Sequence, residues 1–163
     1  MNHFVQFYEK HKISPVSQDI ADMQKHADRR IALYRTLGLP PMLFSGKRVL
    51  EVGPGSGFNS IITATFEPEH YVLVEPNTTG FEHTQELFRK HSLERDNISF
   101  INAYVEDVHD QVPFDIVLCE GMLHGIQNQE QVLRALDQQL KPGGVLVTTC
   151  SDALSYFFEN CRR

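Results

Sequence analysis

The stretch Val49–Asn59, which reads VLEVGPGSGFN, decides the fold of this chain. It is a short apolar strand that runs directly into a glycine-rich turn, after which the chain can begin a helix. Gly53, Gly55 and Gly57 lack the Cβ atoms that would hinder a sharp turn and keep a ligand away from the backbone amides. The stretch therefore predicts a loop that binds a cofactor, and a tight turn that binds nothing is the alternative.

The spacing of the glycines argues against a dinucleotide site. The dinucleotide fingerprint GxGxxG, counted from Gly53, requires a glycine where Phe58 stands. Counted from Gly55, it requires a glycine where Ser60 stands. A nicotinamide oxidoreductase is therefore the weaker interpretation of this loop.

An acidic residue followed by GxGxG resembles the first motif of class I S-adenosylmethionine (SAM)-dependent methyltransferases. The motif is Glu51–Gly57, EVGPGSG, and Leu140–Leu146, LKPGGVL, resembles the family's turn into its fifth strand. The resemblance extends from Lys47 to Thr149. It implies a Rossmann-like core with strand order 3-2-1-4-5, SAM as cofactor and S-adenosyl-L-homocysteine (SAH) as product.

The chain beyond Gly46 alternates between strand and helix patterns. Short, nearly continuous apolar runs predict strands at 48–52, 71–75, 98–101, 115–119 and 144–149. Helices are expected at 57–66, 78–91 and 128–140, the last with Val132, Leu133, Leu136 and Leu140 facing inward. This alternation predicts an α/β fold with a doubly wound, mainly parallel sheet.

Both ends of the chain extend this core. Apolar residues at helical spacing predict a helix from Ser17, its N-cap, to Leu37, which Gly38 follows. We expect one domain, 1–163, made of an N-terminal helical cap, 1–45, and a SAM-binding core, 46–163. The family usually adds two strands after the fifth, but the residues after Thr149 read as a helix. We therefore expect a C-terminal truncation, and dimerisation through the exposed sheet edge or the N-terminal helices.

Charge and composition limit the classes of partner that the protein is expected to bind. Residues 1–48 hold eight Lys or Arg against four acids, whereas residues 49–163 hold seven against seventeen. An acidic core argues against nucleic acid, because a phosphate backbone needs a basic surface. The sequence predicts no membrane span and no signal peptide, and three separated cysteines fit the cytoplasm. Cys119 and Cys150 are expected at buried strand ends.

The resemblance assigns cofactor contacts residue by residue. Glu51 takes the position that interacts with the amino end of the methionine moiety, often through water. The carboxylate of Glu75, at the end of the second strand, is placed to accept hydrogen bonds from ribose hydroxyls, and a solvated acid is the alternative. The other expected contacts, on the glycine loop, at the adenine and beside the methyl group, are Gly53, Pro54, Gly55, Gly57, Pro76, Tyr104, Val105 and Cys119.

The segment after the fourth strand, Cys119–Gly125, reads CEGMLHG and lies at the topological switch point, where the family places the transferred methyl group. His124 is the best candidate for a base, Glu120 is second, and a packing role for His124 is the alternative. Arg30 or Tyr8, in helices ahead of the first strand, are candidates for meeting an acidic group of the cofactor or substrate. The histidines show no metal-binding spacing.

These observations predict a SAM-dependent methyltransferase that acts on a small-molecule acceptor at O, N or C. The alternative is a non-catalytic SAM-binding or dimerising domain, or a fragment of a larger methyltransferase.

Overall fold

A five-stranded parallel sheet forms the centre of the protein, as the computed structural model of residues 3–14, 18–150 and 152–162 describes it. Its strands are β1 (Arg48–Val52), β2 (His70–Val74), β3 (Ile98–Ile101), β4 (Phe114–Cys119) and β5 (Leu140–Thr148). Their order is β3-β2-β1-β4-β5, which confirms the predicted doubly wound topology. The carboxyl ends of all five strands consequently meet at one edge.

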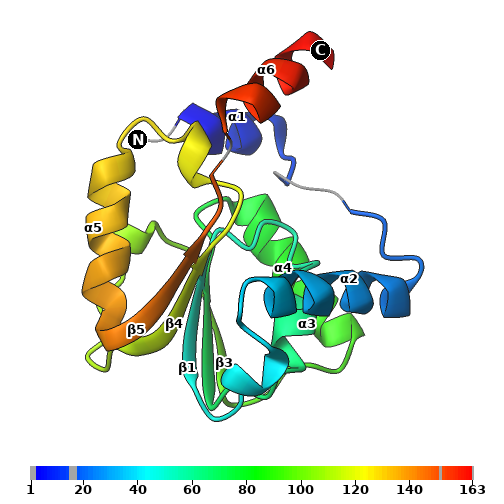
Figure 1. The fold of residues 1–163 in the computed structure, drawn as a ribbon, viewed down its shortest axis with the longest axis vertical. Coiled ribbons are helices and arrows are strands. Elements are labelled where there is room, and N and C mark those ends of the chain that lie inside the picture. The colour runs from blue at the N-terminus through cyan, green and yellow to red at the C-terminus, as the bar shows by residue number, and fades with distance from the viewer. Residues whose placement is uncertain (1–2, 15–17, 151, 163) are drawn as a thin grey trace.

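Helices cover both faces of this sheet (Figure 1). The α-helices are α1 (His3–His11), α2 (Met23–Thr36), α3 (Ser60–Ala64), α4 (Thr78–Lys90), α5 (Gln129–Gln139) and α6 (Ala153–Arg162). Short 3-10 helices are η1 (Pro41–Leu43), η2 (Val105–Asp107) and η3 (Leu123–Gly125). The α5 helix lies on one face, the α2, α3 and α4 helices lie on the other, and α1 and α6 lie above the carboxyl edge.

Each face of the sheet has its own apolar core. On the α2–α4 side, Tyr34, Phe44 and Phe88 are completely buried. On the α5 side, Leu50, Phe114 and Leu136 are completely buried. Within the described ranges, no helix has both the length and the apolar character needed to cross a bilayer.

Several boundaries differ from those predicted. The α3 helix begins only at Ser60, because Gly57 has a φ of +76°, outside the helical region. The β5 strand begins at Leu140, which pairs with Phe114 ahead of a register shift in β4. The expectation that Leu133 faces inward is wrong, since it is 38% exposed on the outer side of α5.

The expectation for the cysteines is confirmed for Cys119 and wrong for Cys150. Cys119 is buried at the end of β4, but Cys150 is exposed. Cys150 follows the last residue of β5, Thr148, by two positions, in a segment that has already left the sheet.

The α2 helix starts later than the sequence suggested. Its N-cap is Asp22, whose side chain accepts a hydrogen bond of 2.9 Å from the backbone N–H of Lys25. The predicted cap, Ser17, lies outside the described residues. At the other end, Gly38 has a φ of +77° and follows the C-cap Leu37, as predicted from its position.

Replacing the cap tests how much α2 depends on it. We expect Asp22→Ala to lower the free energy of unfolding by about 1 kcal/mol, because one backbone N–H loses its acceptor. Chemical denaturation measures this, with Asp28→Ala, on an exposed turn of the same helix, as control. Equal losses for the two variants would contradict a capping role.

Candidate cofactor site

The glycine loop after β1 adopts a backbone shape that glycine alone enters without cost. Gly53, Gly55 and Gly57 have φ angles of +74°, +61° and +76°. In this left-handed region other residues are strained by their Cβ atoms. The loop is joined to the next strand, because the N–H of Gly53 donates to the carbonyl of Val74 at 2.9 Å. Pro54, between the first two glycines, is partly exposed.

The first two turns of α4 pack against this glycine loop. A Cβ atom on Gly80 would lie 2.8 Å from the carbonyl oxygen of Gly55, so a side chain there has no room. The hydroxyl of Thr84, one turn later, donates to the same oxygen at 3.0 Å. Neither Gly80 nor Thr84 was predicted from the sequence as part of this site. Their only signal was a glycine placed early in a predicted helix.

Glu75, the predicted ribose ligand, joins the loops that follow β1 and β2. Its carboxylate accepts a hydrogen bond from the N–H of Gly55 at 2.8 Å and another from the N–H of Asn77 at 2.9 Å. The residue is only 4% exposed. Burial raises the pKa of the Glu75 carboxyl to about 7, and the two amide donors partly oppose this rise. The pKa of Glu75 is thus near the pH at which the protein would be assayed, and its charge is expected to change over the neutral range.

Glu51 lies deeper in the protein. Its side chain points to the α2–α4 side of the sheet, where it accepts hydrogen bonds from the hydroxyls of Ser60 and Tyr71. Burial raises the pKa of the Glu51 carboxyl, while the nearby Arg30 opposes the rise. Both carboxylate oxygens of Glu51 thus accept a hydrogen bond from a side chain of the protein itself.

The other predicted cofactor contacts follow the carboxyl ends of the strands. Pro76 and Tyr104 are partly exposed, while Val105 is buried at the start of η2. Cys119 is buried, and burial raises the pKa of its thiol to about 12, so the thiol is protonated. These residues lie at the carboxyl ends of β2, β3 and β4, on both sides of β1 in the sheet.

The two predicted catalytic residues lie in different surroundings on the loop after β4. Glu120 forms an ion pair with Arg30 of α2, and its side chain is 16% exposed. His124 is exposed on η3. Between them, Met122 packs onto the glycine loop so closely that a Cβ atom on Gly53 would lie 2.7 Å from its sulfur. The loop after β4 and the glycine loop are therefore in direct contact.

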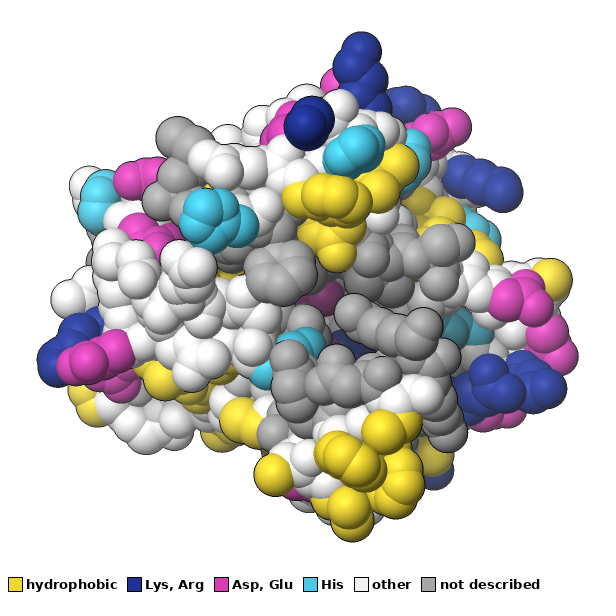
Figure 2. Space-filling model, turned by 90° about the horizontal axis from the view of Figure 1, so that it is seen from above, with side chains coloured by type: hydrophobic (Ala, Val, Ile, Leu, Met, Phe, Trp, Pro, Cys, Tyr) yellow, Lys and Arg dark blue, Asp and Glu magenta, His cyan; other side chains and the backbone are white. Residues whose placement is uncertain are grey.

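Described residues of the N-terminal elements contact the carboxyl edge through several side chains. Glu9 of α1 accepts a hydrogen bond from the N–H of Thr78, at the start of α4. Ser14 is hydrogen-bonded to Ser56 of the glycine loop, and the Nε2 atom of His26 lies 2.7 Å from the carbonyl oxygen of Phe58. Another contact is the Arg30–Glu120 pair. Figure 2 looks down on this edge, and acidic, basic and histidine side chains lie low in a hollow near its centre.

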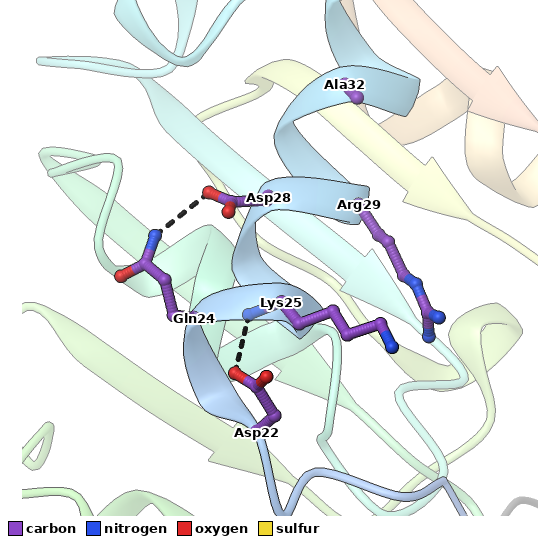
Figure 3. Close-up of a pocket in the computed structure, with 6 residues that line it drawn as sticks. All are labelled: Asp22, Gln24, Lys25, Asp28, Arg29 and Ala32. Atoms are coloured by element: carbon purple, nitrogen blue, oxygen red, sulfur yellow. Dashed lines mark hydrogen bonds between the residues drawn. The ribbon is translucent and has the colours of Figure 1, made fainter.

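A shallow depression on α2 is separate from this edge. It is lined by Asp22, Gln24, Lys25, Asp28, Arg29 and Ala32 (Figure 3). All of these belong to α2 or to its N-cap. The depression includes no residue of the glycine loop or of the loop after β4, so it is not a candidate for the cofactor site.

Most of the chain matches the model of a known protein family. Residues 43–162 match a family model described as a methyltransferase domain, and the matched range contains the glycine loop, Glu75 and the loop after β4. The chain belongs to the class I SAM-dependent methyltransferase family. The glycine motif at Glu51–Gly57 and the turn at Leu140–Leu146 therefore led to the correct family.

Curated relatives of this methyltransferase differ in what their names say they act on. The chain is 32% identical over 122 residues to a ubiquinone biosynthesis O-methyltransferase of Dechloromonas aromatica, covering 70% of this chain and 49% of that protein. It is 34% identical over 106 residues to the protein arginine N-methyltransferase PRMT10 of Oryza sativa subsp. japonica, covering 63% and 27%. The chain thus spans about half, or less, of the length of these relatives.

Solved structures resemble the methyltransferase in fold. The [4+2]-cyclase SpnF has a TM-score of 0.68 at 19% identity, covering 89% of this chain and 58% of that one. Coclaurine N-methyltransferase bound to N-methylheliamine and SAH has a TM-score of 0.63 at 18% identity, covering 83% and 39%. At these identities the likeness concerns the fold alone.

The residues at the carboxyl edge fit SAM, the cofactor of this family. The glycine loop is packed against Met122 and α4 so tightly that side chains at Gly53 and Gly80 would collide with their neighbours. A buried carboxylate, Glu75, lies against the middle of that loop. A bare backbone beside a carboxylate is the combination that a nucleoside with free hydroxyls requires.

The contact between Gly80 and the glycine loop gives a direct test. Helix propensity alone predicts that Gly80→Ala stabilises the protein by up to about 1 kcal/mol. We expect instead a loss of roughly 1–3 kcal/mol in the free energy of unfolding, because the new methyl group displaces the carbonyl of Gly55. Denaturant unfolding measures the change, with Thr79→Ala in the same turn as control. If Gly80→Ala were more stable than the wild type, the glycine loop would be able to move away from the new methyl group at little energetic cost.

Proposed function

We propose that this methyltransferase binds SAM across the glycine loop and transfers its methyl group to a small-molecule acceptor at O, N or C. The observation that carries the proposal is the buried carboxylate of Glu75, hydrogen-bonded to the amide of Gly55 at the carboxyl edge of the sheet. In doubly wound folds a carboxylate in this place receives the ribose hydroxyls of a nucleotide cofactor. Each carboxylate oxygen has a second lone pair for such a hydroxyl.

The other proposed contacts surround Glu75. The backbone of Gly53, Pro54, Gly55 and Gly57 lies along the methionine and ribose portions. On the next strand ends, Pro76, Tyr104 and Val105 border the adenine, and Cys119 borders the reaction centre. Glu51 acts on the methionine amino group through water, which its hydrogen bonds to Ser60 and Tyr71 support.

The chain's own contribution to catalysis is alignment, exclusion of water and, where needed, removal of a proton. Bound SAM supplies an electrophilic methyl carbon on a sulfonium, which needs no further activation. The loop after β4 therefore has to hold the acceptor in line with this carbon and away from water. Where the acceptor must lose a proton, exposed His124 is the proposed base. Glu120 is the second candidate.

A small acceptor fits the crowded carboxyl edge better than a folded protein does. Contacts from Glu9, Ser14, His26 and Arg30 attach the N-terminal segment across this edge. The acidic balance of residues 49–163 disfavours nucleic acid. An arginine-containing peptide, suggested by the named arginine N-methyltransferases, remains the main competing acceptor.

The wider proposals concern the whole protein. We propose one domain, in which a cap, 1–45, covers a SAM-binding core, 46–163, working in the cytoplasm. The free edge of β5, where Val145 is 40% exposed, supports dimerisation there. A non-catalytic SAM-binding domain is the second candidate, because the chain spans only part of the length of its catalytic relatives.

Titration calorimetry tests the cofactor site. We expect micromolar binding of SAM and SAH and no binding of NAD. Glu75→Ala should weaken SAH binding by about tenfold or more, since two ribose hydroxyls lose their acceptor. Glu69→Ala, at an exposed position before the amino end of β2, is the control. NAD binding, or no adenosyl binding at all, would contradict the proposal.

The same titration has a predicted pH dependence. With a pKa of about 7, Glu75 is mostly protonated at pH 6 and mostly ionised at pH 8. Ribose hydroxyls donate to the ionised form, so SAH affinity should fall about tenfold from pH 8 to pH 6. Glu75→Gln, which does not titrate, should bind weakly with a flat profile. If the SAH affinity of the wild type depended on pH as little as that of the variant, Glu75 would not be the ribose ligand.

His124→Ala separates catalysis from cofactor binding. With radiolabelled SAM and a panel of phenols, amines and an arginine-containing peptide, turnover should fall roughly 10²-fold or more if His124 removes a proton. SAH affinity should stay within about twofold, because His124 is exposed on η3. His109→Ala, exposed ahead of β4, is the control. Unchanged turnover of the His124 variant would exclude His124 as the base.

A further inference from the structure

Arg30 connects the N-terminal cap to the loop expected to face the transferred methyl group. The residue is only 5% exposed, although it sits on a helix whose other arginines are exposed. Its NH1 atom donates to Oε1 of Glu120 at 3.1 Å, and NH2 donates to Oε2 of the same carboxylate. An arginine that contacts both oxygens fixes the direction of the carboxylate as well as its position.

Tyr34, one turn further along α2, completes the arrangement. Its hydroxyl accepts a hydrogen bond from NH2 of Arg30 and donates to Oε2 of Glu120 at 3.0 Å. The guanidinium carbon of Arg30 lies 4.2 Å from the centre of the Tyr34 ring. Burial raises the pKa of the Tyr34 hydroxyl, which therefore stays protonated and able to donate. Glu120 thus receives three hydrogen bonds from one helix.

The segment that begins with Glu120 also contacts the glycine loop. Glu120 directly follows β4, and Met122, two residues later, has its sulfur against Gly53. The N–H of Gly121 is in addition held by the hydroxyl of Thr149. Three consecutive residues, Glu120 to Met122, are thus each in contact with another part of the protein.

We propose that Arg30 and Tyr34 are positioning residues that fix Glu120 and, through Met122, the loop after β4 against the glycine loop. The inference rests on the proposed function, because the loop is taken to border the cofactor. In this proposal α2 positions the loop after β4, and Glu120 is the residue through which α2 acts.

Hydrogen exchange of the cofactor-free protein tests the positioning role. In Arg30→Met, the amides of residues 119–125 should exchange at least about tenfold faster, because an unpaired carboxylate leaves its buried position. Arg30→Lys, which keeps the charge, should restore part of the protection. Ile31→Ala, beside Arg30 on the same helix and packed on the apolar core, is the control for a general loss of stability. Exchange in Arg30→Met no faster than in Ile31→Ala would overturn the proposal.

Two further variants test the same contact. Tyr34→Phe does so even if Arg30→Met fails to fold. Tyr34→Phe removes only one donor and should speed exchange of the same amides by about threefold. Arg30→Met/Glu120→Gln should speed it no more than Glu120→Gln alone, since both residues act through one contact. Additive effects of the two substitutions would contradict this coupling.

SAH titration of the same variants separates this inference from the proposed function. If wild type binds SAH, Arg30→Met should weaken binding by about tenfold, while Ile31→Ala should weaken it by less than about twofold. If wild type binds no SAH, the proposed function fails, and the exchange data still decide whether Arg30 fixes the loop. Equal weakening in the two variants would reduce Arg30 to a structural role.

Discussion

The carboxylate of Glu75 is the interaction on which the carboxyl edge depends. It accepts the amides of Gly55 and Asn77, and so joins the loop after β1 to the loop after β2. The side chain of Asn77 then caps α4 by accepting from the N–H of Gly80, and Gly80 in turn supports Gly55. A single buried acid thus links a loop, a helix cap and a close backbone contact. A ligand that binds this carboxylate would have to share it with the amides of Gly55 and Asn77.

The second constraint is the burial of charge between α2 and the sheet. Arg30 lies close to two carboxylates, Glu51 on β1 and Glu120 after β4, and its positive charge opposes the rise that burial causes in the pKa of Glu51. Burial of this kind is costly unless the partners are well placed. The bidentate contact with Glu120 meets that condition. The N-terminal helices are therefore held to the core by directional contacts as well as by apolar packing.

The sequence predicted the fold well because its signals were local. Continuous apolar strands and helical spacing each depend on a few neighbouring residues, and they predicted the doubly wound sheet. The glycine motif is equally local, and the family that it resembles implied the strand order. Glu75 could be predicted as a site residue because parallel strands end at a common edge. Boundaries were predicted less well: the positive φ of Gly57 delays α3, and a register shift in β4 accompanies the early start of β5. Both depend on backbone geometry that composition does not encode.

What the sequence determined by itself was the doubly wound sheet, the glycine loop and the methyltransferase family, since motif and periodicity are properties of consecutive residues. Only the tertiary structure decided which distant side chains meet. It turned Glu51 toward Tyr71 and Ser60, brought Arg30 to Glu120 across ninety positions of sequence, and set Met122 against Gly53. Contacts of this kind depend on how helices pack on the sheet, and a helix pattern predicts an inward face without naming its partners.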